Sequence, residues 1–184
     1  MNAPAPAGAV LRPVADTDIP AITRIYAHHV RTGFGSFEES PPDAAEMTRR
    51  LHDITRRGLP WLVAVRGDGV IGYAYAAPFR GRSAYRFTVE DSIYVADGEG
   101  GRGVSSALLA ELVARCTALG FRQMVAVIGD SRNVGSIGVH AGQGFRVAGV
   151  LPAVGFKHGR WFDSVMMVRA LGDGDGTPPR DPRA

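Results

Sequence analysis

The sequence predicts a single α+β domain built on a mixed, mostly antiparallel central sheet flanked by helices. The chain has 184 residues, of which 45% are hydrophobic and 21% charged, the size and balance of one globular domain. Helical and strand-like hydrophobic periods alternate along it, with no internal repeat and no linker between them. A long helix also separates two strands, and a crossover of that length allows the strands to pair in parallel.

Two helices open the domain. Asp16 is suited to cap a helix over residues 16–32, in which isoleucines recur near helical spacing. Residues 34–42 contain prolines and other turn formers, so we expect a loop there. Asp43 is suited to cap a second helix over residues 43–57, which a glycine ends.

Three strands and a glycine-rich loop follow the helices. Residues 61–66 and 70–77 are β-like and are separated by a Gly-Asp-Gly turn, which predicts a hairpin. Residues 85–95 form a third, longer strand rich in aromatic and β-branched side chains. The glycine-rich segment 97–103 leads into a helix over residues 104–119 with an apolar face.

The last third of the domain returns to the sheet. It contains a predicted strand at 124–128, a short helix at 136–142 that Gly138 weakens, and two closing strands at 145–150 and 162–168. The resulting element order is that of an α+β protein with a mixed sheet.

The two ends of the chain differ in composition from the middle. Residues 1–10 and 171–184 are rich in Ala, Pro, Gly and Asp, so we expect a flexible N-terminal tail and a disordered C-terminal tail around a domain at 11–170. No apolar run approaches the roughly 18 residues that span a bilayer, and no secretory leader is visible. We therefore expect a cytoplasmic protein without a membrane partner.

Charge and cysteine content exclude several classes of function. The 21 Lys and Arg residues are spread along the chain and nearly balanced by 18 Asp and Glu, so we expect no nucleic-acid partner. Lys157 is the one lysine. Cys116 is the one cysteine, which excludes an internal disulfide and a multi-cysteine zinc site. The histidines show no clear ligand spacing, so we expect no metal.

The segment SIYVADGEGGRGVSSALL, residues 92–109, indicates an anion-binding turn. Glycines allow a close approach to the backbone, and free N–H groups at a helix start favour phosphate oxygens. The spacing matches neither the dinucleotide fingerprint nor the phosphate loop of nucleotide hydrolases. By itself the segment is also compatible with a flexible turn before a helix.

In its wider context this segment resembles the acetyl-CoA signature of the GNAT superfamily of N-acetyltransferases. Within that superfamily the chain resembles the phosphinothricin acetyltransferase group, which is similar to the amino-acid N-acetyltransferases for methionine sulfone and sulfoximine. The resemblance rests on five stretches in matching order: FEESPPD (37–43), YAAPFRGRSAYRFTVEDSIYV (75–95), AVIGDSRN (126–133), SIGVHAGQGF (136–145) and GFKHGRWFDSVMM (155–167). It implies a GNAT fold, acetyl-CoA as co-substrate, a small amino acid as acetyl acceptor, and a homodimer.

The resemblance also implies the site residues. Glu90 is expected to be the general base, because an α-ammonium is mostly protonated at neutral pH and must lose a proton to attack a thioester. Asp91 should face the opposite side of the strand, so that only one of the two carboxylates faces a cleft. His140 matches a second catalytic position. A solvated carboxylate and an ordinary core histidine are the alternatives for Glu90 and His140.

The remaining implied residues bind the two substrates. A bulge near Tyr94 and Val95 is expected to aim a backbone N–H at the acetyl carbonyl. The implied substrate-binding residues are Phe37, Arg80, Arg82 and Tyr85, with solvated loop charge as the alternative for the two arginines. The implied cofactor-binding residues are Ile93, Tyr94, Val95, Gly101, Arg102, Gly103, Val104, Ser105, Ser106 and Asn133.

The sequence departs from the family signature in the glycine-rich loop. Gly100 stands where the family has Arg or Gln, and Ser105 where it has Gly or Ala. The lost side chain and the nearby Glu99 should weaken anion binding. A weak or degenerate coenzyme A-binding module, or an acetyltransferase for another amine, is therefore the alternative function.

We expect His28, His29 and His52 to be ordinary helix residues, and His158 to border the substrate site.

The homodimer has one argument of its own. The segment GRWFDSVMMV, residues 159–168, carries apolar side chains on both faces of a strand, and one face would need a cover. A second subunit is one solution. A central strand covered on both faces by the chain's own helices is the other.

Overall fold

The computed structural model describes residues 8–179 and shows seven strands in one sheet with four α-helices around it. The sheet order is β1-β2-β3-β4-β5-β7-β6, with β4 and β5 parallel and the other neighbours antiparallel. This confirms the predicted α+β class and mixed sheet. The strands are β1 (Val10–Pro13), β2 (Trp61–Arg66), β3 (Gly69–Pro78), β4 (Thr88–Val95), β5 (Gln123–Gly129), β6 (Arg146–Lys157) and β7 (Arg160–Ala170).

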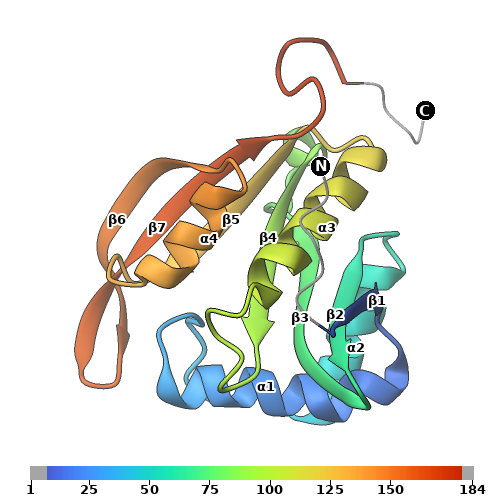
Figure 1. Cartoon of the computed structure of the whole chain (residues 1–184). Helices are drawn as coiled ribbons and strands as arrows, with labels where there is room; N and C mark the ends of the chain where they lie inside the picture. Colours follow the sequence, from blue (N-terminus) through green and yellow to red (C-terminus); the bar gives the residue numbers. More distant parts are fainter. Residues whose placement is uncertain (1–7, 180–184) are drawn as a thin grey trace.

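The helices cover the sheet on both faces. α3 (Val104–Ala118) and α4 (Val134–Gly142) lie together on the near face of the sheet in Figure 1. α1 (Ile19–Thr32) and α2 (Ala44–Thr55) belong to the other face, where Tyr26 of α1 packs edge-on against Tyr94 of β4. The core between these layers is apolar. Its fully buried side chains include Ile22, Leu62, Val89, Leu108, Leu112 and Met124.

Four elements differ from the sequence prediction. Asp16 does not cap the first helix, because residues Asp16–Asp18 form a 3₁₀ turn and α1 begins at Ile19. β1 is an additional strand, and it pairs antiparallel with β2. β4 begins at Thr88 and not at Tyr85, because residues Ser83–Tyr85 form a short 3₁₀ turn before the strand. The last hairpin is longer than predicted, and its turn at His158 and Gly159 has positive φ angles of 50° and 73°.

The segment after β7, which the sequence predicts to be part of a tail, contacts the domain up to Thr177. Leu171 is only 1% exposed, and Arg122 donates hydrogen bonds to the carbonyl oxygens of Gly174 and Thr177, each at 2.7 Å. Leu171 and Arg122 thus connect this stretch to the domain. The rest of the predicted tails, residues 1–7 and 180–184, lies outside the described residues. Within 8–179, no helix combines the length and apolar character that crossing a membrane requires.

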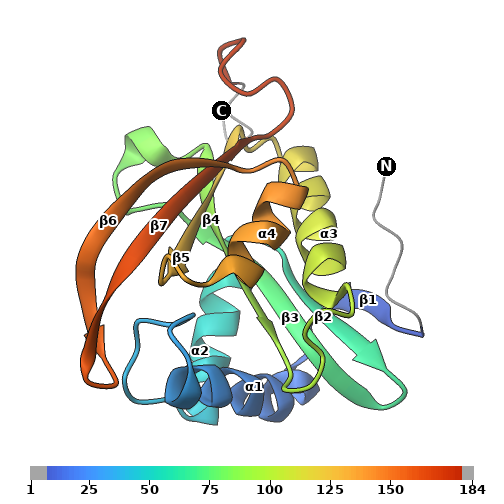
Figure 2. The ribbon, with the colours of Figure 1, turned by 60° about the vertical axis from the view of Figure 1, so that its left-hand side comes forward.

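The sheet splits between its two parallel strands. β4 and β5 pair only from Thr88 with Gln123 to Asp91 with Ala126. Beyond that point β4 continues along β3 to Val95, while β5 continues along β7 to Gly129. Figure 2 shows the two strands diverging beside α4. This divergence opens the middle of the sheet to both faces.

Candidate active site

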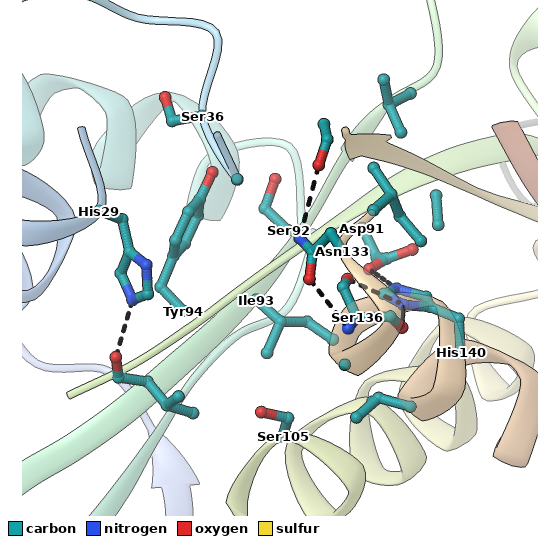
Figure 3. A pocket seen from close by; sticks show the side chains of 18 of the residues that line it. His29, Ser36, Asp91, Ser92, Ile93, Tyr94, Ser105, Asn133, Ser136 and His140 are labelled. Carbon is teal, nitrogen blue, oxygen red and sulfur yellow. Dashed lines mark hydrogen bonds and ion pairs between the residues drawn. The ribbon is translucent and has the colours of Figure 1, made fainter. Parts of the chain in front are cut away.

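A cavity of about 650 Å³ occupies the split in the sheet. Its walls come from α1, the loop between α1 and α2, the end of β4, β5, the glycine-rich loop, and α4. Figure 3 shows Tyr94 and Ser36 on one side of β4, and Asn133, Ser136 and His140 on the other. The cavity therefore has two sides, which we call the α1 side and the α3/α4 side.

The structure brings together about half of the predicted site residues. Those lining the cavity are Phe37, Glu90, Ile93, Tyr94, Val95, Gly101, Ser105, Asn133 and His140. Those outside its lining are Arg80, Arg82, Tyr85, Arg102, Gly103, Val104 and Ser106.

Sequence reasoning missed several lining residues, among them Tyr26, His29, Ser36, Glu38, Asp91, Ser92 and Ser136. The last four of these lie within the stretches that carry the family resemblance, so their position in those stretches could have marked them. The first three lie outside every such stretch, and only the fold brings them to the cavity.

Glu90 lies at the split of the sheet, on the α1 side. Burial raises the pKa of its carboxyl, the nearby Asp91 raises it further, and Arg80 opposes both effects. A carboxylate with a raised pKa accepts a proton more readily than an exposed one, which suits a general base at neutral pH.

Asp91 lies on the other side of β4, as strand alternation requires. Its Oδ2 accepts a hydrogen bond from Nε2 of His140 at 3.0 Å, and both side chains are almost fully buried. The expectation that only one of the neighbouring carboxylates faces a cleft is nevertheless wrong, because Glu90 and Asp91 both line the cavity. Residues 90–95 all line the cavity, so both faces of the strand border it along this stretch.

His140 is held at both ring nitrogens. Nδ1 lies 2.8 Å from the carbonyl oxygen of Ser136, and Nε2 lies 3.0 Å from the Asp91 carboxylate. Both partners offer acceptor oxygens, so the geometry suits a ring that donates from both nitrogens. Burial lowers the pKa of His140, but the bond to Asp91 and its charge outweigh that effect and raise it overall. An imidazole that donates from both nitrogens has no free lone pair with which to accept a substrate proton.

The glycine-rich loop leads into α3 as predicted. Gly101 and Gly103 have φ angles of 73° and 80°, which disfavour any residue with a Cβ. Gly103 is the N-cap of α3, so the first free N–H groups of that helix follow the loop directly. Gly100, Gly101 and Ser105 line the cavity on the α3/α4 side.

Glu99 does not present an uncompensated negative charge beside this loop. Both of its carboxylate oxygens accept hydrogen bonds from Arg66, each at 2.8 Å, and its side chain is only 15% exposed. Arg102 adds a longer contact of 3.8 Å. Arg66 of β2 therefore balances the Glu99 charge, a pairing that the sequence order did not reveal.

The end of β4 presents backbone N–H groups to the cavity without a bulge. The register between β3 and β4 is continuous from Gly72 with Val95 to Pro78 with Val89, so the predicted bulge near Tyr94 and Val95 is absent from this pairing. The amide of Ala96 bonds to the carbonyl of Ile71. Since antiparallel pairing alternates, the amides of Ile93 and Val95 point to the opposite edge, which β5 has left.

His29 secures this end of β4, and the expectation that it is an ordinary helix residue is wrong. Its Nε2 donates to the carbonyl oxygen of Val95 at 2.8 Å, and its ring packs 5.4 Å from that of Tyr94. Burial lowers its pKa. A neutral histidine therefore holds the last residue of β4 in place.

Asn133 begins α4. Its Oδ1 accepts a hydrogen bond from the amide of Ser136 at 3.2 Å, which makes it the N-cap of the helix. It also lines the cavity, and its role in binding the cofactor stays a prediction.

The predicted arginines lie beside the cavity rather than in it. The Arg80 guanidinium sits 5.2 Å above the Phe79 ring and 5.8 Å above the Tyr85 ring, and Arg82 is exposed. Phe37 is the one predicted substrate residue in the lining, where it stacks on Phe162 at 4.9 Å.

Residues 11–166 match the family model described as an acetyltransferase (GNAT) domain. The chain belongs to the GNAT acetyltransferase family. This GNAT acetyltransferase is 56% identical over 169 residues to a phosphinothricin N-acetyltransferase from Alcaligenes faecalis, an alignment covering 92% of this chain and 86% of that protein. The family assignment confirms the resemblance inferred from the sequence and the prediction of an N-acetyltransferase.

Two further comparisons agree. The GNAT acetyltransferase is 39% identical over 160 residues to an L-methionine sulfoximine/L-methionine sulfone acetyltransferase from Pseudomonas aeruginosa, covering 86% of this chain and 92% of that protein. The crystal structure of a phosphinothricin acetyltransferase from Sinorhizobium meliloti in complex with acetyl-CoA superposes with a TM-score of 0.92, at 49% identity and 95% coverage of both chains. The GNAT fold is thus confirmed.

Proposed function

We propose that the protein transfers the acetyl group of acetyl-CoA to the amine of a small amino acid of the phosphinothricin or methionine sulfoximine type. The observation that carries the proposal is Glu90, a carboxylate with a raised pKa placed where the sheet splits. The named activities of relatives that align along most of the chain support the substrate class.

The α3/α4 side of the cavity fits acetyl-CoA. The start of α3 and the glycines before it offer N–H groups to phosphate oxygens. From there the cavity continues past Ser105 and Asn133 to the exposed edge of β4. The amides of Ile93 and Val95 at that edge suit the amide groups and the thioester oxygen of an acyl-pantetheine arm.

The α1 side fits the acetyl acceptor. Glu90 accepts one proton from the substrate ammonium, directly or through water, and leaves a nucleophilic amine. A backbone N–H at the end of β4 stabilises the negative charge that develops on the carbonyl oxygen. In the overall reaction the amide C–N bond forms, the thioester C–S bond breaks, and the thiol of coenzyme A and one proton are released.

His140 supports the reaction without taking the substrate proton. Its two donated hydrogen bonds tie α4 to β4 through Asp91 and balance the Asp91 charge. It thereby fixes the helix that begins at Asn133. This assignment replaces the hypothesis that His140 acts as a base together with Glu90.

The alternative of a degenerate binding module is less well supported. A carboxylate with a raised pKa, backbone N–H donors and the glycine-rich loop all border the same cavity, which supports an active enzyme. A thiol-release assay with acetyl-CoA and a panel of amines, including methionine sulfone and phosphinothricin, tests the proposal. Turnover on such amino acids is expected, and binding of acetyl-CoA without turnover on any amine would overturn it.

We also propose that the protein forms a homodimer through β6. This strand lies at the edge of the sheet and is exposed along nearly its whole length. A long apolar edge strand is an aggregation hazard unless it is covered. The exposed apolar side chains on β6 and its partner strand are Val147, Val150, Leu151, Val154, Phe156 and Trp161.

A second copy of this chain is the occupant that this surface favours. The patch is continuous along one strand, and a two-fold contact would place the same strand of both copies together. The apolar surface lies mainly on β6, and not on the 159–168 segment that the sequence argument used, since Phe162, Val165 and Met167 of β7 are buried.

Light scattering tests the dimer. A dimeric mass is expected at micromolar concentration, and Leu151→Glu should shift it to the monomer. Val10→Glu is the matched control, because Val10 is an exposed apolar residue on the opposite edge strand. A monomeric mass for the unaltered chain would overturn this proposal.

A further inference from the structure

The loop between α1 and α2 contacts these two helices and also the hairpin formed by β6 and β7. Ser36, Phe37 and Glu38 of this loop line the α1 side of the cavity. Figure 2 shows the loop beside the tip of the hairpin formed by β6 and β7, although the two segments lie far apart in the sequence. The loop therefore forms a wall of the cavity, and its position depends on contacts with the helices and with the hairpin.

On its own side the loop is held by polar contacts. The hydroxyl groups of Ser36 and Tyr26 lie 2.9 Å apart. Glu38 accepts hydrogen bonds from the Tyr26 hydroxyl at 3.0 Å and from Arg50 at 2.7 Å. These bonds connect the loop to α1 and α2.

On the hairpin side the loop is held by packing and by Lys157. Phe34 and Phe37 both pack against the ring of Phe162, at 5.2 and 4.9 Å. Lys157 is only 2% exposed, and its Nζ donates to the carbonyl oxygen of Ser36 at 2.9 Å. Burying a cation costs free energy unless the charge is paired or hydrogen-bonded. The carbonyl oxygen of Ser36, 121 residues away in the sequence, supplies the hydrogen bond for the buried Lys157 ammonium.

We propose that Lys157 is a positioning residue for the amine substrate: by bonding to Ser36 it fixes the α1–α2 loop and so places Phe37 and Glu38 in the wall of the α1 side, on which Glu90 also lies. Lys157 is not in the lining of the cavity, so it acts through the loop and not by contact with substrate. The α3/α4 side is built from other segments. The effect should therefore fall on the amine and not on acetyl-CoA.

This inference rests on the proposed function, since it concerns the KM of an amine substrate. Lys157→Met keeps the length of the side chain and removes the donor. The expected result is a rise of about tenfold in the KM for the amine, the scale of one lost charged hydrogen bond, with the KM for acetyl-CoA and kcat nearly unchanged. Hydrogen exchange should rise at residues 33–38 and stay constant in α3.

Arg122→Met is the matched control. Arg122 is also a long cation that donates to a backbone carbonyl, but it holds the segment after β7 and does not line the cavity. It is expected to lower the melting temperature without changing the KM for the amine. Equal changes in the KM for the amine in both variants would show that general loss of stability is the cause, and would overturn the proposal.

A second measurement uses the unaltered chain. Lys157 is the one lysine of the sequence, so reductive methylation followed by mass spectrometry reports on a single ε-amine. The proposal predicts that Lys157 stays unmodified in the native protein and reacts after unfolding. Rapid methylation of the native protein would overturn it even if Lys157→Met does not fold. A wild-type chain that acetylates no amine would instead overturn the proposed function, while methylation and exchange still test the loop contact.

Discussion

The two sides of the cavity are built in different ways. The α3/α4 side comes from two segments that are each continuous in the sequence: the end of β4 with the glycine-rich loop and the start of α3, and α4 with its cap Asn133. The α1 side combines the α1–α2 loop with β4 and relies on Lys157 and Phe162 from the last hairpin. A site formed by a continuous segment can be recognised in the sequence. A wall assembled from distant segments can be recognised only in the folded protein.

The largest expected effect comes from replacing Glu90 on the α1 side, and it should leave acetyl-CoA binding on the α3/α4 side unchanged. Glu90→Gln keeps the shape of the side chain and removes the base, so kcat should fall by about 10²- to 10⁴-fold, while the affinity for acetyl-CoA stays constant. Because burial raises the pKa of Glu90, its ionised form costs folded-state stability at neutral pH. The variant should therefore also melt slightly higher. Steady-state kinetics, calorimetry and thermal unfolding together test this, and a wild-type kcat would contradict it.

The His140–Asp91 pair gives the second largest effect. The folded-state pKa of His140 is raised, so the pair stabilises the protein fully below the ordinary histidine pKa, and this contribution is lost as the pH rises through the raised value. His140→Gln should cost about 3 kcal/mol in the free energy of unfolding at low pH and less at high pH. Asp91→Asn should abolish the same pH dependence. Denaturant unfolding across the pH range measures both, and a pH-independent difference from wild type would contradict the doubly protonated ring.

Gly129 tests how closely the α1–α2 loop approaches β5. A Cβ at this position would overlap the carbonyl oxygen of Phe34, so Gly129→Ala must displace the loop. We expect a loss of about 2 kcal/mol in the free energy of unfolding and a higher KM for the amine. Denaturant unfolding and steady-state kinetics measure the two effects.

Gly138→Ala is the control for that variant. A Cβ at Gly138 would meet no other atom within 4 Å, and the residue lies inside α4. This substitution should stabilise the helix by about 0.5–1 kcal/mol. If both alanine variants change the KM for the amine alike, the close approach at Gly129 is not what shapes the α1 side.

The smallest effect concerns the departure from the family signature. Gly100 lines the cavity, and a Cβ added to it would meet no other atom within 4 Å, so an arginine has room there. Gly100→Arg should tighten acetyl-CoA binding by about 1 kcal/mol, the scale of an exposed charge contact, and leave the KM for the amine unchanged. Calorimetry measures this, and unchanged affinity would show that the phosphates lie elsewhere.

Much of the fold was predictable because each element carries its own signal. Asp43 does accept a hydrogen bond from the amide of Glu46 as a helix cap, and the apolar face of α3 buries Leu108 and Cys116. β1 gave no signal because four residues are too few to show a period. The length of the last hairpin was not predictable because β6 is exposed on both faces and shows no alternation.

The site was predictable only where it is local. Glu90 and the glycine-rich loop belong to recognisable stretches and line the cavity. The contribution of Lys157, the role of His29 and the neutralisation of Glu99 by Arg66 all depend on contacts between distant segments. A single sequence contains no signal for such pairs, so these contacts become visible only in the folded protein.

The most direct test of the account is the pH dependence of kcat/KM for the amine in the wild type and in Glu90→Gln. We expect the wild-type rate to fall at acidic pH through a pKa above the ordinary value of a glutamate, because Glu90 becomes protonated. In Glu90→Gln we expect this acidic limb to disappear. The remaining, slower rate should then follow only the fraction of the substrate amine that is deprotonated. The same acidic limb in both proteins would show that another group removes the proton.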